Sequence, residues 1–154
     1  MASPSEISSP EFKSPQVLAW LLRVLGAMDL AALVTVVLPW RWVAEIHQRT
    51  GLGALPAGQI VDYLVRTTPA LYAVHGALLL YLSFDVVRYH PLIRFLGWLM
   101  MAHGLLLVFI DVQAGMPLWW TICEGPIFAT LGLAMLLLTR HEIQRPRNGD
   151  QISN

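Results

Sequence analysis

Apolar residues are concentrated in four long runs that fill most of this chain. The runs cover residues 16–39, 69–87, 92–112 and 117–139, with polar segments between them. An apolar segment of about 20 residues is long enough to cross the hydrocarbon core of a bilayer as an α-helix. The pattern therefore predicts an all-α membrane protein, a four-transmembrane-helix antiparallel bundle in which each run is one span.

The connections between the runs predict how the spans are arranged. The turns at 88–91 and 112–116 are short, so the second, third and fourth spans should be antiparallel neighbours. The connection at 40–68 is long, and apolar positions within 41–50 and 59–67 have helical spacing. We expect two short interfacial helices there, lying flat at the lipid headgroups.

Composition agrees with a membrane protein made of one domain. Hydrophobic residues make up 56% of the chain and charged residues 13%, whereas soluble domains carry about 25% charged residues. The bundle should cover residues 16–140, between a disordered cytoplasmic tail at 1–15 and a polar C-terminal tail at 141–154. The formal net charge is zero and no basic block occurs, which argues against nucleic acid as a partner. The single cysteine, Cys123, excludes an internal disulfide.

The distribution of basic residues predicts the orientation in the membrane, because lysine and arginine are more frequent on the cytoplasmic side. The side with both tails and the turn between the second and third spans carries seven basic residues: Lys13, Arg23, Arg88, Arg94, Arg140, Arg145 and Arg147. The opposite side carries three: Arg41, Arg49 and Arg66. We therefore expect both termini in the cytoplasm. The expected partner is the lipid bilayer, with another membrane protein or a second copy of the chain as further candidates.

Acids and histidines inside the predicted spans are the candidate functional residues. Ionisable groups are costly in hydrocarbon and usually face protein or water, so each marks either a helix contact or a site. Asp29 and His103 fall near mid-membrane, and His75 and Glu124 fall in the outer half. We expect these four residues to form a polar cluster that is open toward the outer side.

Structural roles compete with functional ones at these positions. For His75 and His103, a hydrogen bond between helices is favoured over ligation, because polar residues commonly join spans. Glu124 lies beside Pro126, which predicts a kink or an exposed carbonyl in the fourth span. For this acid, binding of a cation or proton and a structural hydrogen bond to Asp29 or a histidine are equally favoured.

Other polar and small residues in the spans have simpler predicted roles. Arg23 and Asp85 lie near the cytoplasmic ends of the first two spans, at depths that favour a structural ion pair. In the third span Gly97, Gly104 and Asp111 repeat every seven residues and so share one stripe. We expect this stripe to pack inward, because small residues let helix backbones approach closely.

Three segments carry a resemblance to known proteins: RVLGAMDLAALVTVVLPWRWVAEIH, SFDVVRYHPLIRFLG and GMPLWWTICEGP. They resemble a group of small, uncharacterised four-span bacterial membrane proteins, which are loosely similar in size and span count to the DoxX and BphX-like families. The resemblance covers roughly residues 20–138. It implies a location in the bacterial cytoplasmic (inner) membrane, and it implies no activity or catalytic residues.

Three functional hypotheses follow, in order of preference. The first is a non-enzymatic accessory or scaffold component whose polar residues join its helices. The alternative is a pathway for a small molecule, an ion or a proton that uses the intramembrane acids and histidines. The third is a redox component that binds haem or quinone, although the sequence predicts no cofactor and no metal site. No nucleophile with a base and an orienting acid can be assembled, so we do not expect an enzyme.

Overall fold

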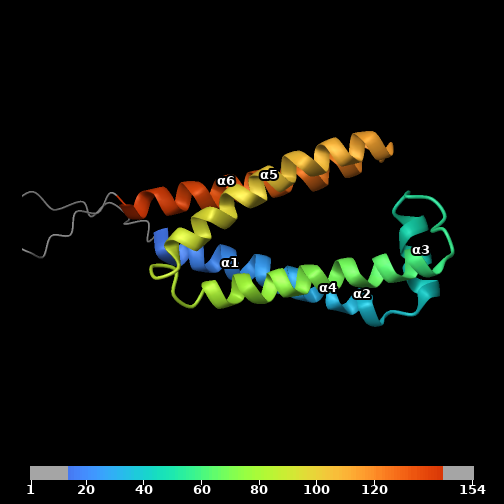
Figure 1. Cartoon of the computed structure of the whole chain (residues 1–154), viewed down its shortest axis with the longest axis horizontal. Helices are drawn as coiled ribbons and strands as arrows, with labels where there is room; N and C mark the ends of the chain where they lie inside the picture. The colour runs from blue at the N-terminus through green and yellow to red at the C-terminus, as the bar shows by residue number, and fades with distance from the viewer. Residues whose placement is uncertain (1–13, 144–154) are drawn as a thin grey trace, which may run out of the picture.

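A computed structural model describes residues 14–143, and that part of the chain contains helices and connecting loops but no strand (Figure 1). There are six helices in this range: α1 (Ser14–Ala31), α2 (Leu33–Val37), α3 (Trp40–Arg49), α4 (Gln59–Leu82), α5 (His90–Ala114) and α6 (Leu118–Ile143). The all-α class predicted from the sequence is therefore confirmed. Most of the two predicted tails, 1–13 and 144–154, lies outside the described residues, whereas the remaining ends of those tails belong to α1 and α6.

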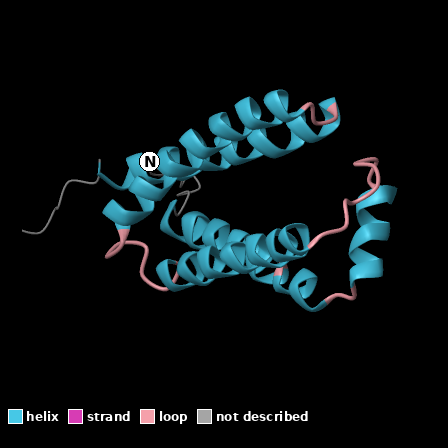
Figure 2. Ribbon diagram, turned by 45° about the vertical axis from the view of Figure 1, so that its right-hand side comes forward, coloured by secondary structure: helices cyan, strands magenta, loops and turns pink. Residues whose placement is uncertain are grey.

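The helices are arranged as two pairs. One pair is α1 and its continuation α2 packed against α4, and the other is α5 packed against α6. A smaller contact between α1 and α6 connects the pairs, whereas α4 and α5 do not pack closely against each other. Figures 1 and 2 show that the two pairs meet at the end that holds the connection between α4 and α5 and diverge toward the end that holds α3.

The hydrophobic core is concentrated at the end where the pairs meet. Its fully buried members come from the start of α1 and α5 and from the end of α4 and α6: Leu18, Leu22, Leu79, Leu82, Ile93 and Met135. At the same end, Nε2 of His90 in α5 donates to the carbonyl of Thr139 in α6 across 2.7 Å. The far end lacks a comparable core, since neither α2 nor α3 has a buried residue.

Glycine contacts hold each pair together at very short range. A Cβ atom added at Gly76 in α4 would lie 2.6 Å from the carbonyl oxygen of Gly26 in α1. In the other pair, a Cβ at Gly104 in α5 would lie 2.5 Å from the carbonyl oxygen of Gly125 in α6. The stripe of Gly97, Gly104 and Asp111 is buried, which confirms the prediction that it packs inward.

Among residues 14–143, three segments are long and apolar enough to cross a membrane: Pro15–Val37, His90–Ala114 and Leu118–Arg140. The fourth long helix, α4, is not among them, because charged and polar residues are spread along it from Gln59 to His75. The second predicted span at 69–87 is also wrong in its bounds, since the helix begins at Gln59 and ends at Leu82. The count of four spans therefore stays a prediction.

Of the two predicted interfacial helices, one is present as a separate element. It is α3, an amphipathic helix without buried residues that lies at the end where the pairs diverge (Figures 1 and 2). The second, expected at 59–67, is wrong as a separate helix, because the backbone continues through Pro69 into the rest of α4. Proline inside a helix costs about 3 kcal/mol, and packing of α4 against both α1 and α2 offsets that cost.

The first predicted span is interrupted near its outer end. The helix stops at Ala31 and resumes at Leu33, and the backbone N–H of Ala32 bonds to the carbonyl of Asp29, three residues earlier. The side chain of Thr35 also donates to the carbonyl of Ala32. The following residues, LVTVV, are mostly β-branched, and such residues lose rotamer freedom in a helix. The interruption comes two residues after Asp29.

Candidate functional site

A cleft of about 500 Å³ lies between α4 on one side and α5 with α6 on the other. It occurs where the two helix pairs diverge beyond the shared core. Its lining residues are Thr68, Leu71, Tyr72 and His75 from α4, Leu96, Leu99, Met100 and His103 from α5, and Phe128 from α6. The cleft is therefore mostly apolar, with a few polar side chains on two of its walls.

The two main walls of the cleft have the same residue spacing. On α4 the lining positions are 68, 71, 72 and 75, and on α5 they are 96, 99, 100 and 103. Both sets follow the i, i+3, i+4, i+7 pattern that places residues on one face of a helix. Each set ends in a histidine, His75 on α4 and His103 on α5.

Asp29 and His75 form a bond between α1 and α4. Nδ1 of His75 lies 2.7 Å from Oδ2 of Asp29, and both side chains are largely shielded, with 31% and 22% exposed. An ionised carboxylate only accepts hydrogen bonds, so Nδ1–H of the imidazole is the donor. In a neutral ring this leaves Nε2 as an acceptor. The Asp29 carboxylate thus fixes the orientation of a histidine that faces the cleft.

Glu124 is held by a neighbour on its own helix. The indole N–H of Trp120 donates to its carboxylate, and both side chains are half-buried. Glu124 lies one helical turn from Phe128, so the acid and the cleft-lining ring share a face of α6. α6 remains helical through Pro126, beside this acid.

His103 is the most open member of the predicted polar cluster. Its side chain is exposed, and its ring meets the ring of Phe128 edge to face, with 5.6 Å between the centroids. The four predicted residues thus come from four different helices around the cleft region. Two of them, His75 and His103, line the cleft itself, and Asp29 is bonded to a lining residue. The structure does not bring the two histidines together.

The predicted ion pair between Arg23 and Asp85 is not formed within the described residues. Asp85 lies in the turn after α4 instead of inside a helix, and its carboxylate accepts the backbone N–H of Arg88. The guanidinium of Arg23 lies over the ring of Trp20, 5.8 Å from its centroid. The prediction failed because it assumed that the helix continued to residue 87.

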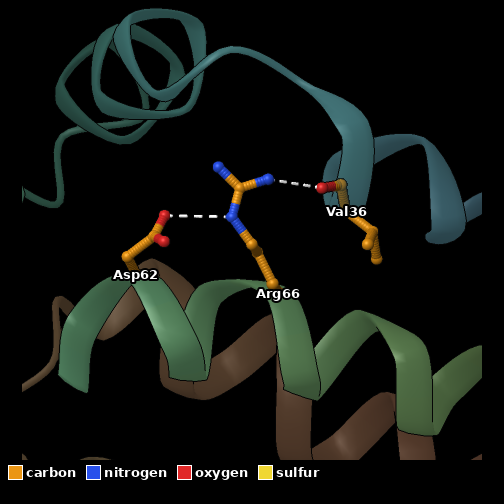
Figure 3. Close-up of polar contacts among 3 residues, drawn as sticks. All are labelled: Val36, Asp62 and Arg66. Atoms are coloured by element: carbon orange, nitrogen blue, oxygen red, sulfur yellow. Dashed lines mark hydrogen bonds and ion pairs between the residues drawn. The ribbon is translucent and has the colours of Figure 1, made fainter. Parts of the chain in front are cut away.

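Arg66 fastens α2 to α4, and only its bond to α2 was unpredicted, because the spacing of Asp62 and Arg66 already predicts a pair on one helix. Arg66 in α4 donates through Nε to the carboxylate of Asp62, 3.0 Å away, and through Nη1 to the carbonyl of Val36 in α2 (Figure 3). That carbonyl belongs to the last turn of α2 and has no partner within its own helix. The contact therefore satisfies an open helix end and holds the interrupted segment beside the N-terminal part of α4.

Two further features could have been found from spacing alone. Thr68, Tyr72 and His75 share a helical face in the sequence, which would have added the first two to the candidate residues. Trp120 and Glu124 are four residues apart, a spacing that brings side chains together. The contribution of Phe128 needed the packing of α6 against α5, which the sequence does not specify.

The chemistry available here is hydrogen bonding and charge, with apolar contact. Among residues 14–143 there is no group of three or more His, Cys, Asp or Glu side chains arranged to hold a metal ion. No protein-family model matches the chain, and comparisons with curated proteins and with solved structures find no significant match. The arrangement of the residues is therefore the basis for any functional proposal.

Proposed function

We propose that this protein binds a small amphipathic molecule from the membrane in the cleft between its two helix pairs. The observation that carries the proposal is a cleft of about 500 Å³ with two apolar walls, each ending in a histidine. Sites for small molecules usually have volumes of about 300–1,000 Å³ and are mostly apolar with a few polar groups that orient the ligand. The cleft has this size and this composition.

The proposal includes four membrane spans, with α4 as the fourth. This helix has 24 residues, which gives a length of about 36 Å and exceeds the hydrocarbon thickness of about 30 Å. We place the end with the shared core at the cytoplasmic face of a bacterial inner membrane, because basic residues are more frequent there. The diverging end, with α3, then lies at the outer face.

The ligand would enter from the lipid phase. α4 and α5 form opposite walls of the cleft, yet each packs mainly against another helix, so the space between them is open at the side. His103 lies at this opening and is exposed. A molecule that dissolves in the bilayer can therefore reach the cleft without crossing the protein.

The polar lining residues would orient the bound molecule. His75 is the best fixed of these, because Asp29 holds its ring across 2.7 Å. Preorganised groups lose less entropy on binding than mobile ones do. The hydroxyls of Thr68 and Tyr72 lie on the same face of α4 and add two further hydrogen-bonding groups. The apolar part of the ligand would lie against Leu99, Met100 and similar side chains.

Saturable photolabelling tests the proposal. The probe is a neutral aryl diazirine with a short alkyl chain, applied to the full-length protein in detergent micelles, with adducts mapped by mass spectrometry. We expect adducts at the stripes of α4 and α5, and we expect excess unreactive analogue to suppress them. Labelling spread evenly over all exposed apolar residues, without suppression by the analogue, would contradict the proposal.

Two matched tryptophan variants locate the site. Leu99→Trp adds a ring to a half-exposed position that lines the cleft, and it should abolish the suppressible adducts at the other lining residues. Leu105→Trp adds the same ring to an exposed position on α5 that does not line the cleft, and it should leave them unchanged. Equal effects of the two variants would place binding elsewhere.

A further inference from the structure

The charges around the cleft are unbalanced. No lysine or arginine is among its lining residues in the described structure. One carboxylate, that of Asp29, is bonded to the lining residue His75, and a second, that of Glu124, lies one helical turn from the lining residue Phe128. The nearest cationic side chain along α4, Arg66, is already bonded to Asp62 and to a carbonyl of α2.

Two aromatic rings add to this preference for positive charge. Tyr72 and Phe128 line the cleft from α4 and α6. The face of an aromatic ring attracts a cation, and the attraction is stronger where water is excluded. The remaining lining is aliphatic or thioether side chain, which suits an apolar ligand body but does not compensate a charge. The lining holds no lysine or arginine that would compensate an anion, and its basic groups are the imidazoles of His103 and of His75, the latter already bonded to the Asp29 carboxylate.

We infer that the ligand of the cleft is a lipophilic cation, a molecule that carries one positive charge on a body of aromatic or alkyl groups. This inference rests on the proposed function and narrows its ligand class. The charged centre would lie near Tyr72, between the Asp29–His75 bond and Glu124, and the apolar body would lie along the leucine and methionine side chains of α5. A bare metal ion does not fit, because residues 14–143 offer no group of three or more ligating side chains.

Two ions of the same shape and opposite charge test the inference. Tetraphenylphosphonium and tetraphenylborate each carry four phenyl groups, and each is used to displace the neutral diazirine probe from the full-length protein. Because the two ions partition differently into micelles, their concentrations are expressed for the micelle phase. We expect tetraphenylphosphonium to displace the probe at a concentration at least about tenfold lower than tetraphenylborate does. An opposite charge nearby favours binding of the cation, and a like charge opposes binding of the anion.

Charge-neutralising variants assign the preference to the two acids. Glu124→Gln keeps an oxygen that can accept from Trp120, and Asp29→Asn keeps one that can face His75. Each of the two variants should reduce the preference for tetraphenylphosphonium over tetraphenylborate. Glu45→Gln serves as the control, because this exposed acid in α3 pairs with Arg49 and does not line the cleft.

The outcomes separate this inference from the function on which it rests. Equal displacement by both ions, stronger displacement by tetraphenylborate, or an unchanged preference in both acid variants would overturn the inference. In each of these cases saturable labelling by the neutral probe would persist, and the proposed function would stand. Loss of all saturable labelling in the unaltered protein would instead remove the proposed function, and the inference with it.

Discussion

Replacing Gly104 with alanine should loosen the α5–α6 pair, and Gly97 provides a matched control on the same helix. At Gly104 the added Cβ would lie 2.5 Å from both the carbonyl oxygen of Gly125 and the backbone nitrogen of Ala129. Backbone atoms cannot rotate away. Heavy atoms in ordinary contact are about 3.5–4.0 Å apart, so the helices would have to separate by about 1 Å. At Gly97 the closest atom is 3.1 Å away in the flexible side chain of Leu136, and the nearest backbone atom, the carbonyl oxygen of Gly132, is 3.2 Å away, so a shift of a few tenths of an ångström suffices.

The expected magnitude follows from two opposing contributions. Overpacking typically costs about 1–3 kcal/mol, and exchanging glycine for alanine inside a helix favours folding by up to about 1 kcal/mol. The two backbone contacts at Gly104 put its cost at the upper end of that range, about 2–3 kcal/mol, so after the gain in helix propensity we expect Gly104→Ala to lower the free energy of unfolding by about 1–2 kcal/mol, whereas Gly97→Ala should change it by less than about 0.5 kcal/mol.

Reversible unfolding in mixed micelles of dodecyl maltoside and SDS measures this difference, with tryptophan fluorescence and circular dichroism as independent signals. Both variants gain the same helix propensity, so a difference between them reports on contact between helices alone. Equal shifts for the two variants, or a gain in stability for Gly104→Ala, would refute the reasoning, because they would mean that the backbones are not in the contact described.

Three further experiments test contacts in the same unfolding assay or by hydrogen exchange. A double-mutant cycle of Asp29→Ala and His75→Ala should give a coupling free energy of about 0.6 kcal/mol, as for other hydrogen bonds between membrane helices. A coupling free energy of zero would show that the two side chains are not bonded. Arg66→Met should accelerate amide exchange in α2 without affecting α5 and α6, because the carbonyl that it holds becomes unpaired; uniform acceleration would contradict this. Trp120→Phe should destabilise by about 1 kcal/mol through the lost donor to the α6 carboxylate, while Trp119→Phe, on an exposed neighbour, should have little effect.

Helix content was predictable because hydrophobic periodicity and length depend only on local sequence. The bounds at Pro69 and at residues 31–33 were not, because they depend on packing between distant segments. Proline predicts a helix start, yet the helix continues through Pro69, and α4 as a whole packs against α1 and α2. The β-branched run after Ala32 favours an interruption, but apolar character alone suggested a continuous span.

The candidate site was predictable in its residues and less so in its geometry. Asp29, His75, His103 and Glu124 could be singled out because ionisable groups are costly inside apolar runs. The depth estimates put His75 nearer the outer end than His103, whereas the helix bounds put His75 seven residues from the end of α4 and His103 thirteen residues from the start of α5, at the α4–α5 connection. The sequence did not indicate that the helices form two pairs with a cleft between them, because that arrangement depends on which glycine meets which partner. Gly26 meets Gly76 across 50 positions of chain, a pairing that spacing alone does not reveal.

Because the buried core is confined to one end, the two helix pairs can rotate relative to each other about that end. α5 has 25 residues and is therefore about 37 Å long. If each pair moves as a rigid arm about the core near Leu79 and Ile93, a rotation of about 5° displaces the far end by about 3 Å over that length. Such a rotation changes few core contacts, but it changes the distance between the two helix pairs at the end that holds α3 by roughly the diameter of a methylene group. The end with packed side chains thus resists deformation, whereas the width of the cleft, which determines the size of the ligand, changes with the least loss of contacts.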